Sequence, residues 1–227
     1  MSAQHWFTYR GTEIFNVGDT GAYSYKTGHV ELDADGCPRA YHPDDTGLDF
    51  LANAGFPDGG WRSVLVVDPQ DPSRPFVQQE GPAKGFFLSM TTLRDPTLPD
   101  TDSAKYVDAV TVPYIVFPGA FHALAGTGTW GDVVMVRALG ASGLQSAAIV
   151  ADGGPTDAPL GEISLSLAEA LGGHNPNPRN GAGAPVGLFQ YVVFPRSRQR
   201  PPWRRTVADI AAQAQALLDA IGGWPAL

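Results

Sequence analysis

Glycine and proline recur along this whole sequence, and their spacing constrains the fold more than any other feature. The chain of 227 residues contains 27 glycines and 20 prolines, which break it into short apolar runs. Both residues disfavour helix interiors and favour tight turns. The pattern therefore predicts many short strands joined by turns rather than a helical bundle. Hydrophobic residues make up 43% of the chain, which is enough for a buried core.

Short β-branched and aromatic runs predict where the strands lie. Residues 143–154 follow 131–138 as the second half of a predicted hairpin, which carries Asp152 to its end. We expect one mainly β domain over residues 1–227, folded as a six-stranded, double-psi-like β-barrel with a few peripheral helices. The predicted strand regions are residues 21–36, 61–68, 84–93, 110–119, 131–138, 143–154 and 188–195.

Two segments have the pattern of helices. In residues 164–173, Ser166 precedes Glu169 by three positions, the spacing of a capping box, and two glycines end the segment. In residues 206–223, Thr206 is the expected N-cap and apolar residues repeat at helical spacing. We expect both helices to lie outside the β core.

The net charge of the chain limits the kinds of molecule that we expect it to bind. The formal net charge is -8, which argues against nucleic acid and favours a neutral or cationic ligand. The basic run at 196–205 is expected to be a solvated loop. No apolar run approaches the roughly 20 residues of a membrane span, and no secretory signal is visible. We expect a monomer without nucleic-acid or membrane partners, cytoplasmic or exported by a route that needs no such signal.

Acidic residues gather in two places before residue 56. Asp33 and Asp35 alternate in a predicted strand, so both face one side, where a bound cation offsets their repulsion or a polar turn accommodates them. The further ligands of a calcium loop are missing there. Residues 40–55 contain His42, Asp44, Asp45 and Asp49 but lack the spacing of zinc ligands, and they are typical of a turn and a short helix. In that segment Asp45 is a candidate substrate contact. We expect no metal and no cofactor.

Carboxylates remain as the candidate catalytic groups. The sequence has no nucleophile elbow, phosphate-binding loop or dinucleotide fingerprint, and Cys37, its single cysteine, has no positioned base nearby. Asp152 ends a predicted strand and Glu162 precedes a predicted helix, on either side of one turn-rich loop. One carboxylic acid and one carboxylate are what hydrolysis of an acetal requires. The alternative is that both are ordinary loop acids.

Five segments resemble, in order, the fungal-type chitosanases of glycoside hydrolase family 75, in particular its bacterial-type members. The most specific is AIVADGGPTDAPLGEISLSLAEALG at 148–172, which resembles the family's Asp-x-Gly-Pro…Gly-Glu-x-Ser signature. The resemblance covers roughly residues 23–220. The other four segments are YKTGHVELDADG at 25–36, VDAVTVPYIVFPG at 107–119, GDVVMVRA at 131–138 and QYVVFPRS at 190–197.

The resemblance implies an endo-acting hydrolase that cleaves β-1,4-linked glucosamine in chitosan with inversion at the anomeric carbon. It places the family's two essential carboxylates at Asp152 and Glu162, and we assign Glu162 as general acid and Asp152 as general base. Acidic groups near such a cleft attract the protonated amines of the substrate. Two alternatives are a hydrolase of another aminosugar glycan, such as peptidoglycan, and a catalytically silent carbohydrate-binding or interaction module. The expected substrate-binding residues are Asp33, Asp35, Asp45 and Tyr114.

Overall fold

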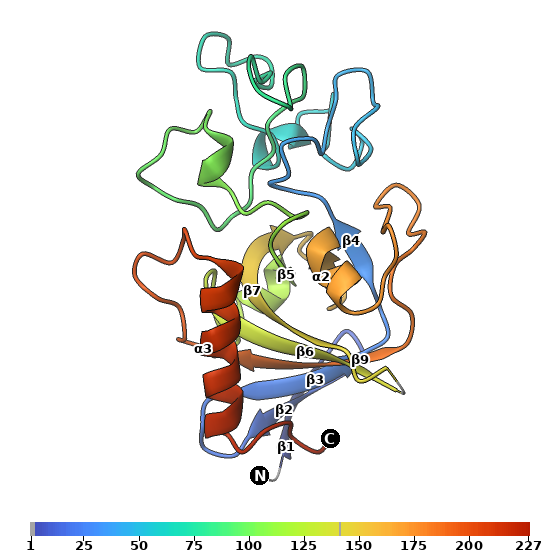
Figure 1. Ribbon diagram of the computed structural model, residues 1–227, viewed down its shortest axis with the longest axis vertical. Coiled ribbons are helices and arrows are strands. Elements are labelled where there is room, and N and C mark those ends of the chain that lie inside the picture. The colour runs from blue at the N-terminus through green and yellow to red at the C-terminus, as the bar shows by residue number, and fades with distance from the viewer. Residues whose placement is uncertain (1–2, 141) are drawn as a thin grey trace.

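A computed structural model describes residues 3–140 and 142–227, in which nine strands form one mixed sheet with three α-helices around it (Figure 1). The helices are α1 (Gly119–His122), α2 (Leu165–Ala170) and α3 (Val207–Ala220). The strands are β1 (Ala3–Tyr9), β2 (Thr12–Val17), β3 (Tyr23–Thr27), β4 (Glu31–Asp33), β5 (Tyr114–Pro118), β6 (Val133–Leu139), β7 (Gln145–Gly154), β8 (Glu162–Ser164) and β9 (Leu188–Phe194).

The sheet is open, with the strand order β1-β2-β3-β9-β6-β7-β5-β8-β4. Antiparallel pairs connect β1 through to β7, whereas β5 pairs with β7, and β4 with β8, in parallel. The prediction of a mainly β fold is confirmed, but the prediction of a closed barrel is wrong. Beyond β4, which has only three residues, the chain leaves the sheet for irregular loops, so this edge never reaches β1 at the other one.

Both predicted helices are present beside the sheet. Helix α3 packs on β6, β7 and β9, and Thr206 caps it as predicted, because its hydroxyl accepts a hydrogen bond from the Asp209 N–H. Helix α2 is capped by Ser164 instead of Ser166. Ser164 is the extended last residue of β8, so the helix begins two residues earlier, directly after the strand, than the capping-box spacing suggests. No helix of the described residues is both long and apolar enough to span a membrane.

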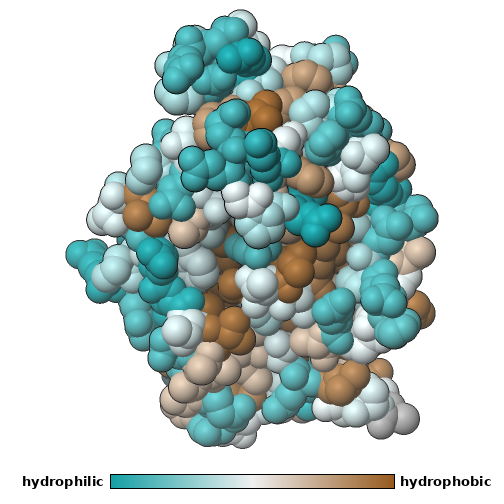
Figure 2. Space-filling view, turned by 45° about the horizontal axis from the view of Figure 1, so that its top comes forward, coloured by the Kyte–Doolittle hydropathy of each residue, from teal (hydrophilic) through white to brown (hydrophobic). Residues whose placement is uncertain are grey.

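Residues 34–113, all of them described, form the loop-rich upper part of Figure 1. The strands predicted at 61–68 and 84–93 are wrong. The first begins in the 3-10 helix η1 (Gly60–Ser63), and a single isolated bridge, Leu65 to Ser89, joins the two regions. A second 3-10 helix, η2, spans Ser103–Lys105. The helix expected within 40–55 is a series of turns. Glycine and proline end each run before a ladder can form. Figure 2 shows this part as largely hydrophilic, with hydrophobic residues exposed mainly in the middle of the face.

Candidate active site

Asp152 lies near the end of β7, where it pairs with Val116 of β5. Its Oδ1 accepts three hydrogen bonds: from the Thr92 N–H at 3.0 Å, the Thr92 hydroxyl at 2.7 Å and the Gly153 N–H at 2.7 Å. The residue is only 7% exposed. Burial raises the pKa of Asp152 to about 6, and the three donors oppose that rise because they stabilise the carboxylate.

Glu162 begins β8, on the other side of β5, and its parallel partner on β4 is Glu31. Burial is the main cause that raises the pKa of Glu162 well above its ordinary value, and the charges of Asp33 and Glu31 raise it further. A Cβ on residue 154 would lie 2.7 Å from Glu162 Oε2, so a side chain at this position would displace the carboxyl group from its observed place. The surroundings of Glu162 therefore favour its protonated form.

Both carboxyl groups face one cavity of about 500 Å³. Their strands flank β5, which separates the two backbones by two strand spacings, or about 9 to 10 Å. Gly154, which contacts Glu162, is two residues after Asp152 and so lies on the same face of β7, about 6.6 Å along the strand. The structure therefore brings together the two carboxylates that the sequence analysis selected.

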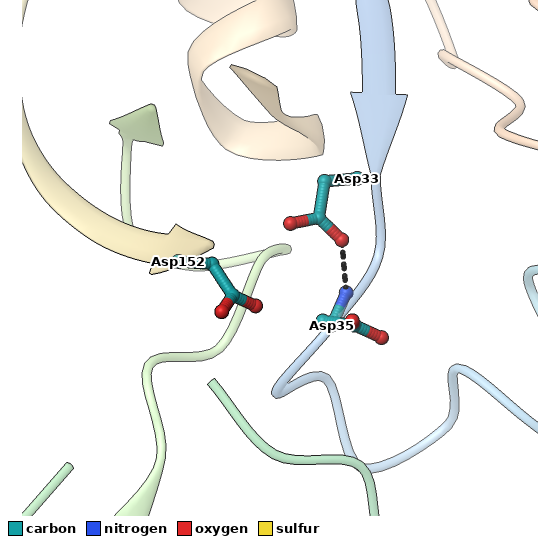
Figure 3. A group of neighbouring side chains, drawn as sticks. All are labelled: Asp33, Asp35 and Asp152. Carbon is teal, nitrogen blue, oxygen red and sulfur yellow. Dashed lines mark hydrogen bonds between the residues drawn. The ribbon is translucent and has the colours of Figure 1, made fainter. Parts of the chain in front are cut away.

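Asp33 and Asp35 enter the same cavity, although not from one strand as predicted. Asp33 ends β4, and Asp35 belongs to the following turn, where its N–H donates to Asp33 Oδ1 at 2.7 Å. Carboxylate oxygens of Asp33, Asp35 and Asp152 lie within 4.8 Å of one another (Figure 3), a spacing that also suits a cation. Burial, followed by the charge of Asp152, raises the pKa of Asp33 to about 7. Burial and then the charge of Asp33 raise that of Asp35 well above its ordinary value.

Two predicted substrate contacts lie elsewhere. Asp45 is outside the cavity lining, where its carboxylate accepts the Leu51 N–H and pairs with Arg179 at 3.4 Å. Tyr114 is completely buried, and its hydroxyl donates to the backbone carbonyl of Asp35 at 3.0 Å. Tyr114 therefore supports the Asp35 turn from within the core and does not line the cavity.

The sequence analysis did not place Asp49 and Asn53 in the cavity. Both lie in the turns of residues 40–55, and no local pattern reveals which way these turns lead the chain. Asp49 Oδ1 accepts the amide of Asn53 at 2.8 Å. Among the described residues, the lining includes six acids and no lysine or arginine. The acids are Glu31, Asp33, Asp35, Asp49, Asp152 and Glu162.

Thr92 is the other residue that the sequence did not reveal, because it acts from a distant loop. This loop, residues 89–93, is hydrogen-bonded to β7 and to the Asp35 turn. The Leu93 N–H donates to the Ala151 carbonyl at 2.8 Å, and the Gly36 N–H donates to Ser89 Oγ at 2.8 Å. The loop therefore fixes Asp152 through Thr92 and the Asp35 turn through Ser89.

Comparison with known proteins does not assign the chain to a family. The chain matches no protein-family model, and a search of curated proteins finds no similar sequence. The function has to be inferred from the cavity and from the motifs of the sequence.

Proposed function

We propose that this protein is a glycoside hydrolase that cleaves a β-1,4-linked glucosamine polymer of the chitosan type by an inverting, two-carboxylate mechanism. One observation carries the proposal: Asp152 and Glu162 reach the same acidic cavity from opposite sides of β5, in different surroundings. Three donors stabilise the carboxylate of Asp152, whereas burial and neighbouring charges raise the pKa of Glu162. A pair of carboxyl groups with separated pKa values is what general acid and general base catalysis requires.

The two environments support the assignment of roles. Glu162, kept protonated by burial and by neighbouring charges, donates its proton to the glycosidic oxygen as the bond to the anomeric carbon breaks. Asp152, whose Oδ1 is held by three donors, accepts a proton from the water that attacks the anomeric carbon. The products are a free hydroxyl on the leaving sugar and an inverted reducing end.

The spacing of the strands is wide enough for inversion. Backbones about 9 to 10 Å apart leave room for a water molecule between side chains that lean toward one cavity. Inverting enzymes separate their carboxyl groups by about 6.5 to 9.5 Å, whereas retaining enzymes bring them to about 5 Å. Because Gly154 has no side chain, space is left beside the carboxyl group of Glu162.

The charge of the cavity supports a cationic sugar. The lining includes six acids and, among the described residues, no lysine or arginine, so the acids that are ionised create a negative potential that attracts protonated amines. This observation favours glucosamine over an acetylated sugar, which carries no charge. Asp33, Asp35 and Asp49 are the residues that we expect to contact the amines.

Release of reducing ends from chitosan, chitin and peptidoglycan tests the proposal. We expect release from chitosan above all, first products in the α-anomeric form by proton NMR, and no dependence on a metal chelator. Glu162→Gln is the control for a contaminating hydrolase. Release from peptidoglycan alone would replace the substrate class, and a folded protein that binds chitosan without cleaving it would identify a silent binding module.

A further inference from the structure

A second cavity, of about 610 Å³, has the opposite charge from the first. We call it the arginine cavity, because Arg196, Arg198 and Arg200 line it. The chain as a whole is acidic, yet among the described residues none of these three arginines forms an ion pair with a carboxylate. The arginine and lysine ion pairs involve Arg10, Arg74, Lys105 and Arg179. The remaining lining residues are Gly126, Gly128, Thr129, Asp132 and Pro195.

The loop that carries the arginines is held by the residues between them. The Val133 N–H of β6 donates to Ser197 Oγ at 2.8 Å, and Gln213 of α3 donates to the Ser197 carbonyl at 2.6 Å. The Gln199 amide donates to the Gln213 side chain at 3.3 Å. Ser197 and Gln199 therefore fasten the loop to β6 and α3, while the arginines, which alternate with them, line the cavity and are exposed to solvent.

The one acid of the arginine cavity is occupied by backbone groups. Asp132 is completely buried, its Oδ1 accepts the Arg198 N–H at 2.9 Å, and its Oδ2 accepts the Thr129 N–H at 2.8 Å. Its carboxylate joins the two loops of the cavity and forms no ion pair with the three guanidinium groups. Three positive charges against one negative charge leave the cavity cationic.

We propose that the arginine cavity binds a tetrahedral oxyanion, a phosphate or sulfate group. Guanidinium groups present paired N–H donors that match the oxygens of such a group, and a charge-assisted hydrogen bond is about twice as strong as a neutral one. The site is separate from the acidic cavity and does not depend on the proposed hydrolysis. A nucleic acid backbone fits less well, because the chain as a whole carries a net charge of -8.

Titration of the 15N-labelled protein with inorganic phosphate tests this inference, with sodium chloride at equal ionic strength as the reference. We expect saturable shifts of amide signals within 126–132 and 195–200. The double variant Arg196→Gln, Arg198→Gln should weaken the affinity at least about tenfold. Arg94→Gln, an exposed arginine outside the cavity, should bind phosphate as the unchanged protein does.

Further probes separate the sources of the anion. Sulfate and glucosamine 6-phosphate should compete with phosphate, and glucosamine should not. Shifts that chloride reproduces, or that persist in a folded double variant, would overturn the inference. Binding of a short DNA duplex that is much tighter and displaces phosphate would identify a nucleic acid site instead.

Discussion

Asp71 on the surface and Asp152 in the acidic cavity have nearly the same hydrogen-bond donors and opposite pKa shifts. Asp71 Oδ1 accepts the N–H of Ser73 at 3.1 Å and its hydroxyl at 2.6 Å, and these bonds lower the pKa of Asp71. Asp152 Oδ1 accepts the same two groups from Thr92, with a third from Gly153, yet the pKa of Asp152 is raised to about 6. Burial therefore outweighs the donors in the cavity.

Glu162 extends the comparison to a group without such donors. Burial raises its pKa, as for Asp152, and the charges of Asp33 and Glu31 add to the effect. The difference between the two cavity acids thus follows from the three hydrogen bonds to Asp152 together with the neighbouring charges at Glu162. Under the proposed function, we expect the donors to make Asp152 the base and Glu162 the acid.

The largest expected effect is on catalysis. Asp152→Asn and Glu162→Gln each keep the shape of the side chain but remove the transferable proton or its acceptor. Each should lower kcat on chitosan by about 10²- to 10⁴-fold, the usual contribution of general acid or base catalysis. Asp71→Asn is the surface control and should keep the full rate. Near-normal turnover by either cavity variant would remove that residue from the mechanism.

A second effect is on stability. The folded-state pKa of Asp33 is about 7, above the ordinary value of 3.8, so the folded protein binds its proton more tightly than the unfolded chain does. Stability is then lost as pH rises from about 4 to about 7. Asp33→Asn, which can still accept the Asp35 N–H, should raise the free energy of unfolding at pH 8 by up to about 4 kcal/mol. Denaturant unfolding of both proteins at pH 4 and pH 8 measures this free energy. A variant that at pH 8 is no more stable than the unchanged protein would contradict the account.

A smaller effect should follow from the Thr92 hydroxyl. Thr92→Val keeps the size of the side chain and the backbone N–H but removes one donor to Asp152 Oδ1. The rising limb of kcat/KM against pH, expected near pH 6 in the unchanged protein, should move upward by about one unit. Thr92→Ser, which restores the hydroxyl, should return the limb to its place. A loss of rate at all pH values without this shift would indicate a purely structural role.

The smallest effect belongs to the surface group. The pKa of Asp71 is lowered in the folded protein, so the stability that it contributes is present at neutral pH and lost in acid. Asp71→Asn should therefore lower the melting temperature slightly at pH 7 and leave it unchanged at pH 2. A higher melting temperature of Asp71→Asn at pH 7 would contradict the distinction between surface and cavity carboxylates, because a gain in stability is expected only of the cavity variant Asp33→Asn.

The sequence predicted what depends on local patterns. Alternating and β-branched runs identified the region of β6, β7 and β9, and Thr206 marked the start of α3. Asp152 and Glu162 could be selected because each adjoins a recognisable element on either side of a turn-rich loop. Strands β1 and β2 were not predicted, although each pairs with its neighbour in sequence: β1 with β2, and β2 with β3.

The rest depends on contacts between distant segments. Thr92 reaches Asp152 across 60 positions, and nothing near Thr92 in the sequence indicates that neighbour. The open sheet could not be foreseen either, since closure depends on how far β4 extends before its loop. Asp45 and Asp49 lie in one acidic segment, and only the fold of its turns decides that Asp49 enters the cavity.

Direct titration of the side-chain carboxyl carbons of Asp152 and Glu162 by 13C NMR, in the protein without substrate, tests the central claim most directly. Assignments come from Asp152→Asn and Glu162→Gln. We expect Asp152 to titrate near pH 6 and Glu162 well above its ordinary range, so that one is ionised while the other still holds its proton. Two carboxyl groups that both titrate near pH 4, or Glu162 ionising before Asp152, would contradict the account.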